Sequence, residues 1–151
     1  MDTASHGFWS ALIWRADLWW LAVLFGVLPD IIAQTPKVVY NVWKNKSVKG
    51  LLSEDLPSWI KTYTYYAFHL THSLVIATLI TGITWMFFGV QLWMLAWHLH
   101  IGIDMWTHKK EQATPFLYPF SDFRFSGIHW SSKGFIGMNL LLLASAWIML
   151  V

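Results

Sequence analysis

The sequence predicts an all-α integral membrane protein with about four transmembrane helices in a single domain over residues 1–151. Of the 151 residues, 56% are hydrophobic and 12% are charged, about half the share of roughly 25% in soluble domains. Aromatic residues make up 18% of the chain, with 12 Trp. Such an excess is expected where amphipathic rings anchor a protein at lipid headgroups.

Four apolar stretches approach the roughly 20 residues that a helix needs to cross a bilayer. The first is short and contains Pro29 and Asp30 near its end, whereas the second is the longest. Gly89 alone separates the second stretch from the third, which predicts an antiparallel helical hairpin. The predicted spans are residues 18–33, 63–88, 90–106 and 134–151.

The basic residues fall in two long connections, residues 35–62 and 107–133, and only Arg15 lies elsewhere. The positive-inside rule places both connections in the cytoplasm and both termini on the opposite side. The first connection mixes lysines with Val, Tyr and Trp, which predicts a surface-bound amphipathic helix. Residues 8–14 are too short to cross, so we expect an interfacial or re-entrant helix there. His6 is then an ordinary interfacial side chain on the far side.

Ionisable side chains within membrane spans cost roughly 2.5 to 3.5 kcal/mol each and are candidates for function. Here they gather at the cytoplasmic ends of three predicted helices. His100, Asp104 and His108 are spaced by four residues and share one face of a helix, whereas His98 points away. The full set is Asp30 on the first helix, His69 and His72 on the second, and His98, His100, Asp104 and His108 on the third.

These positions predict a metal site made of His72, His100, Asp104 and Asp30. Because the chain has no cysteine, the ligands must be imidazole and carboxylate groups, a mixed set that suits Zn, Mn or Fe. Asp30 would be a fourth ligand or the base that takes a proton from water, and His108 a ligand or proton shuttle. Thr71 or Ser73 could orient His72 through a hydrogen bond.

The same residues also have structural interpretations. Asp30, which follows Pro29, could simply terminate its helix. His100 and Asp104 could join helices through a hydrogen bond that needs no metal. Interfacial rings in contact with water are the expectation for His69, His98 and His129.

An ordered set of short motifs between Gly26 and Trp130 resembles the membrane-bound metal-dependent hydrolases of bacterial inner membranes, which include the LexA-regulated inner-membrane hydrolase branch. The family often has a further acidic residue and a His where this chain has Ile32 and Ala33, and another His in place of Ala67. The resemblance therefore implies a reduced ligand set. The family also has an early His, which would correspond to His6 if residues 8–14 re-enter the membrane. Its motifs are Leu28-Pro29-Asp30-Ile31, Thr71-His72-Ser73-Leu74, His100 to Asp104 with Thr107, Pro115 to Phe120, and Phe123-Arg124-Phe125.

The resemblance implies a metal-dependent hydrolase at the cytoplasmic face of the bacterial inner membrane, acting on a lipid or lipid-linked phosphoester. The alternative is a noncatalytic metal-binding or structural small subunit of a larger membrane complex, which the reduced ligand set favours. Expected partners are membrane lipid and either a second membrane protein or further copies of the chain. The net charge of +2 is too small to indicate nucleic acid.

Overall fold

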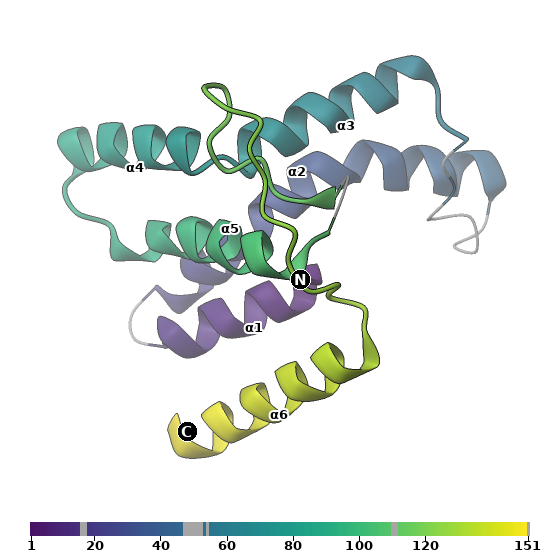
Figure 1. Ribbon diagram of the computed structural model, residues 1–151. Helices are drawn as coiled ribbons and strands as arrows, with labels where there is room; N and C mark the ends of the chain where they lie inside the picture. Colours follow the sequence, from purple (N-terminus) through teal and green to yellow (C-terminus); the bar gives the residue numbers. More distant parts are fainter. Residues whose placement is uncertain (16–17, 47–52, 54, 110–111, 151) are drawn as a thin grey trace.

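The structure is a computed structural model that describes residues 1–15, 18–46, 53, 55–109 and 112–150. Within these ranges the fold is all-helical, as predicted, and contains no strand (Figure 1). The helices are α1 (Thr3–Ile13), α2 (Trp19–Asn45), α3 (Ser58–Thr71), α4 (Leu74–Phe88), the 3₁₀ turn η2 (Leu92–Met94), α5 (Leu95–Thr107) and α6 (Lys133–Leu150).

The central element is α2, which packs against α1, α3 and α5 (Figure 1). It continues through Pro29 and Pro36 for 27 residues. Since proline has no N–H, Pro36 leaves the carbonyl of Ile32 without its usual helical partner. The hydroxyl of Tyr63 on α3 donates to that carbonyl at 3.2 Å. The contact with α3 thus replaces the backbone hydrogen bond that α2 lacks at Pro36.

The length of α2 corrects two predictions. The first helix does not end near residue 33, because it extends to Asn45. The separate surface helix predicted within residues 35–62 is also wrong for the described part, since residues 35–45 belong to α2 and α3 begins at Ser58. Residues 47–52 and 54 of that stretch lie outside the described residues.

The predicted interfacial or re-entrant helix over residues 8–14 is instead α1, a packed helix that starts earlier in the chain. The side chain of Asp2 caps it by accepting a hydrogen bond from the Ser5 N–H at 2.9 Å. A methyl group on Gly26 of α2 would lie 2.1 Å from the Ser10 hydroxyl oxygen, so α1 and α2 approach closely. This packing depends on small residues, whereas the span prediction used only the lengths of apolar stretches.

The orientation of α1 corrects the predicted topology. The amino group of Met1 lies 2.7 Å from the hydroxyl of Thr107, at the C-terminal end of α5. The N-terminus is therefore beside the connection that follows α5 (Figure 1). The prediction that the N-terminus and this connection lie on opposite sides of the membrane is wrong.

The second predicted span is divided into α3 and α4, which are bent by 62° at His72 and Ser73. The hydroxyl of Ser73 accepts a hydrogen bond from the first turn of α4 at 3.2 Å and donates to the carbonyl of Tyr118 at 2.5 Å. A sharp bend leaves backbone groups without helical partners. The connection after α5, residues 112–132, supplies hydrogen-bond partners for groups at this bend.

The same connection satisfies the end of α5. Gly127 donates its N–H to the carbonyl of His108 at 2.9 Å, and Ile128 donates to that of Trp106 at 2.7 Å. A Cβ on Gly127 would lie 2.2 Å from the Trp106 carbonyl oxygen, so only glycine permits this approach. The connection thus joins the α3–α4 bend to the C-terminal end of α5, which it crosses in Figure 1.

The predicted hairpin is present, because α4 and α5 pack against each other after a turn that begins at Gly89. Gly89 has φ +78°, a conformation that favours glycine. Trp97 of α5 is buried against Ala77 and Ile101 and donates its indole N–H to the carbonyl of Thr71 at 2.7 Å. Trp97 therefore belongs to the core, unlike the tryptophans expected to anchor the chain at lipid headgroups.

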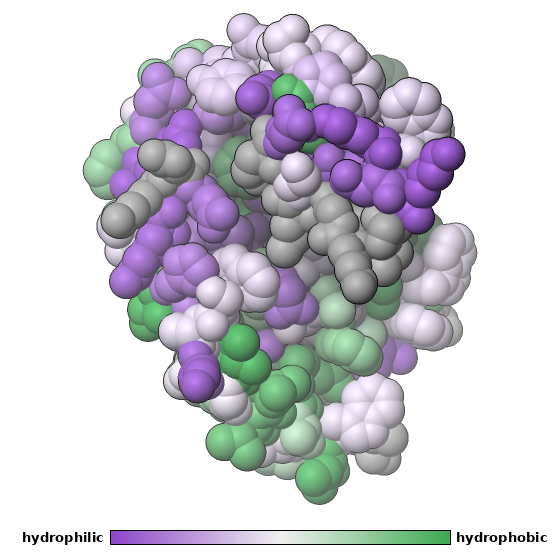
Figure 2. Space-filling view, turned by 90° about the vertical axis from the view of Figure 1, so that its right-hand side faces the viewer, coloured by the Kyte–Doolittle hydropathy of each residue, from purple (hydrophilic) through white to green (hydrophobic). Residues whose placement is uncertain are grey.

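By length and composition, α2 could cross a membrane, and α3 with α4 passes the same test as a bent pair. Four crossings remain a prediction. Apolar side chains are widely exposed, including Phe87 at 74% on α4 and Met149 at 84% on α6. Figure 2 shows hydrophobic side chains gathered at the lower end of one face, level with α6 in Figure 1. Such surfaces are typical of helices that contact lipid or another protein.

We predict that Gly26→Ala lowers the thermal stability of the protein, because the new methyl group would meet the Ser10 side chain at 2.1 Å and push α1 away from α2. Overpacking of this kind costs about 1–3 kcal/mol. Thermal unfolding in detergent, followed by circular dichroism, measures the change. Gly82→Ala is the matched control, since nothing lies within 4 Å of the added atom and helix propensity improves. Equal melting temperatures for the two variants would contradict the close contact between α1 and α2.

Candidate metal centre

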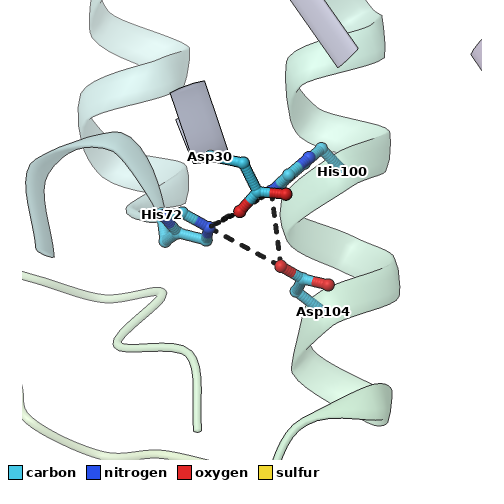
Figure 3. A group of neighbouring side chains, drawn as sticks. All are labelled: Asp30, His72, His100 and Asp104. Atoms are coloured by element: carbon cyan, nitrogen blue, oxygen red, sulfur yellow. Dashed lines mark hydrogen bonds and ion pairs between the residues drawn. The ribbon is translucent and has the colours of Figure 1, made fainter. Parts of the chain in front are cut away.

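Four side chains from three parts of the fold converge on one point (Figure 3). Asp30 comes from α2, His72 from the α3–α4 bend, and His100 and Asp104 from α5. One ligand atom from each lies within 4.8 Å of the others, and this group could hold a metal ion. The structure thus brings together the four residues that the sequence predicts as ligands.

Local structure explains each position. His100 and Asp104 lie one helical turn apart and so face the same way. His72 is the residue at which α3 ends, so the bend directs its ring toward α5. Asp30 reaches the cluster because α2 continues past Pro29 instead of ending there. The interpretation of Asp30 as a helix terminator is therefore wrong.

Both histidines are held in the form that suits a metal ligand. Nδ1 of His100 lies 2.7 Å from the carbonyl oxygen of Gly26, and Nδ1 of His72 lies 3.1 Å from that of Phe68. A carbonyl only accepts hydrogen bonds, so each Nδ1 carries its proton and Nε2 is the nitrogen of each ring that is left to bind a cation. The two Nε2 atoms lie 3.2 Å apart. Facing lone pairs at this distance repel unless a cation or a proton lies between them.

The carboxylates complete a ligand-like arrangement. Oδ2 of Asp104 lies 3.3 Å from Nε2 of His100 and 3.6 Å from Nε2 of His72. Oδ1 of Asp30 lies 3.5 Å from Nε2 of His72 and 3.9 Å from Nε2 of His100. Tetrahedral bonds of roughly 2.0–2.1 Å place neighbouring ligand atoms about 3.4 Å apart. The donor set and its spacing therefore fit a small divalent ion.

The other oxygen of Asp104 has partners of its own. Oδ1 lies 2.9 Å from Nε2 of His6 and 3.2 Å from Nε2 of His108, and it accepts a hydrogen bond from the Met1 amino group. The Thr107 hydroxyl donates to it at 3.4 Å. Hydrogen bonds to a ligating carboxylate fix its orientation. Asp104 is thus held from one side while Oδ2 faces the cluster.

His6 is a site residue that the predicted topology placed on the far side, away from the cluster. Its ring stacks on that of His100, with centroids 3.7 Å apart, and only 1% of the residue is exposed. Burial, with a smaller contribution from His100, lowers the pKa of His6 to about 4, so its ring is neutral at pH 7. The expectation of an interfacial side chain on the far side is wrong, because α1 folds back onto α2. The small residues of α1, such as Gly7, were the available signal.

The remaining predicted positions fall into different roles. His108 contacts Asp104 but is not among the four clustered residues. Thr71 and Ser73 were both predicted as partners that could orient His72. The hydroxyl of Thr71 lies 3.1 Å from Nδ1 of His72, whereas Ser73 caps α4. The other histidines face elsewhere: His98 contacts Thr78 at 3.2 Å, His69 contacts Arg124 at 2.7 Å, and His129 contacts Ser131 at 2.6 Å.

Comparison with known proteins adds no family assignment: no family model, curated protein or solved structure matches the chain. The resemblance to membrane-bound metal-dependent hydrolases rests on the ordered motifs alone. The chemistry of the site must follow from its geometry.

Proposed function

We propose that this protein is a membrane-bound, metal-dependent hydrolase with His72, His100 and Asp104 as metal ligands. The observation that carries the proposal is the 3.2 Å separation of two imidazole Nε2 atoms whose other ring nitrogens already donate to backbone carbonyls. A divalent cation bound between them would be coordinated by both Nε2 atoms, and the adjacent carboxylates would balance its charge.

Asp30 differs from the other three residues in ways that suit a catalytic base. Its side chain is 17% exposed, whereas those of His72 and Asp104 are 0% and 1% exposed. Its Oδ2 accepts a hydrogen bond from the Thr3 hydroxyl at 2.6 Å, which leaves Oδ1 facing the cluster. Two histidines and one carboxylate, with a fourth position open, form a typical catalytic ligand set. Asp30 would then accept the proton of the attacking water at that position.

A bound metal would lower the pKa of a water toward about 7 and polarise the scissile phosphoryl or acyl group. His108 lies on the outer side of Asp104, with its side chain 14% exposed. This position between the buried carboxylate and solvent supports a role for His108 as a proton shuttle. In this proposal Asp30 and His108 transfer protons, whereas His72, His100 and Asp104 bind the metal.

The apolar outer surface of the protein supports a substrate that lies in or on a membrane. One helix is apolar enough to cross a membrane, and many large apolar side chains are exposed on α2, α4 and α6. A protein with such a surface would meet its substrate in or on a bilayer. We therefore propose a lipid or lipid-linked phosphoester as substrate and the bacterial inner membrane as location, in line with the resemblance of the motifs.

A structural metal site is the second candidate, because one observation favours it. All four ligand atoms lie within 4.8 Å of one another, so Asp30 could close the coordination shell. Closed four-ligand shells are typical of structural sites. The protein would then be a noncatalytic subunit in which the ion joins α2, the α3–α4 bend and α5.

We predict that the protein, purified in mild detergent, retains about one equivalent of a transition metal and that His100→Ala removes it, because the variant deletes one of the facing Nε2 atoms. Elemental analysis by mass spectrometry measures the content. His98→Ala is the matched control on the same helix, since His98 contacts Thr78 and not the cluster. The same metal content in wild type and His100→Ala would refute the metal site.

We predict that Asp30→Asn keeps the metal but lowers the rate of lipid-phosphoester hydrolysis by roughly 10²- to 10⁴-fold, the usual contribution of a general base. Headgroup release from mixed phospholipid micelles measures turnover, and elemental analysis of the same sample measures metal. Loss of the metal from Asp30→Asn, together with no turnover by the wild type, would instead establish the closed structural site.

We predict that single cysteines at Lys46 and Val90 are labelled from opposite sides of the membrane. Lys46 follows the C-terminal end of α2, and Val90 follows α4, so the bent α3–α4 pair would separate them. The chain has no cysteine of its own, so an impermeant thiol reagent in sealed vesicles reacts only with the introduced residue. Labelling of both cysteines from the same side would exclude a crossing by α3 and α4.

A further inference from the structure

An open apolar groove lies between the C-terminal half of α2 and the start of α3, away from the metal centre. Its volume is about 390 Å³. Trp43 and Trp59 are 74% and 63% exposed, and Val39 is 59% exposed. The lining residues are Pro36, Val39, Tyr40, Trp43 and Trp59.

A second hollow of about 740 Å³ adjoins this groove, and Trp43 belongs to both. Its other lining residues are Val42, Lys44 and Lys46, so an apolar surface passes directly into a cationic one. Lys44 pairs with Asp55 at 2.5 Å, but the two side chains are 40% and 83% exposed. Water screens such surface pairs strongly, so another anion can compete for Lys44.

We propose that the groove and the hollow together bind one anionic phospholipid of the membrane surface. An acyl chain would lie on the rings of Trp43 and Trp59, and the phosphate would lie beside Lys44 and Lys46. Tryptophan and tyrosine prefer the headgroup level of a bilayer, and lysines near the surface attract anionic lipids. The change from aromatic to cationic lining within one surface matches the two ends of such a lipid.

This site is separate from the metal centre. Tyr40 lies ten residues after Asp30 on the same helix, which corresponds to about 15 Å at 1.5 Å per residue. The bound lipid therefore does not depend on hydrolysis, and the proposal stands or falls independently of the metal. Its role would be to hold the C-terminal end of α2 at an anionic membrane surface.

The test is native mass spectrometry of the full chain, equilibrated in mild detergent with equal amounts of phosphatidylglycerol and phosphatidylcholine. We expect the wild type to retain one phosphatidylglycerol in preference to phosphatidylcholine. Lys44→Gln and Lys46→Gln should each lower that preference about fivefold, the effect of one lysine near an anionic surface. Lys133→Gln, at the start of α6, is the matched control and should leave the preference unchanged.

The apolar half of the site is tested separately. Val39→Asp should lower retention of both lipids, whereas Val90→Asp, at a residue that is 66% exposed outside the groove, should not. Circular dichroism of each variant checks that the helices are intact. The proposal is overturned if Lys46→Gln retains phosphatidylglycerol like the wild type, or if both lipids bind equally. It is also overturned if the groove proves to be covered by a second copy, seen as a dimer that Val39→Asp dissociates.

Discussion

The approach of two imidazole rings in a buried position is the constraint around which the structure is arranged. Nε2 of His72 and Nε2 of His100 lie 3.2 Å apart, and each ring is fixed from behind by a backbone carbonyl. Neither ring can turn away without losing that hydrogen bond in a buried position, where an unpaired polar group is costly. Oxygens of Asp30 and Asp104 surround the same point. A cation bound there would join α2, the bend and α5.

The bend between α3 and α4 places His72 in that position. In a straight helix this residue would occupy an ordinary position on one face, but here it ends α3. The 62° bend is sustained by groups from a distant part of the chain, including the Tyr118 carbonyl that accepts from Ser73. The connection over residues 112–132 also satisfies the last carbonyls of α5. One irregular segment therefore stabilises both elements that carry the histidines.

Asp104 links the metal centre to the first helix. One oxygen faces the cluster, and the other is held by His6 and His108. His6 reaches this carboxylate because Gly7 and Gly26 allow α1 and α2 to pack closely. The helix that is too short to cross a membrane thus orients a ligand at the centre. The candidate metal centre and the proposed lipid site lie about 15 Å apart along α2.

The sequence by itself determined the helical class, the hairpin at Gly89 and the four candidate metal ligands, which are Asp30, His72, His100 and Asp104. Apolar length and four-residue spacing are local properties, and ionisable residues within apolar helices are costly unless they pair with one another or bind an ion. Only the tertiary structure decided the continuation of α2 past Pro36, the bend at His72 and the place of His6. Each depends on a distant partner: the Tyr63 hydroxyl for α2, the carbonyl of Tyr118 for the bend, and Gly26 for α1. Local patterns do not encode such contacts, because they exist only once separate helices have packed.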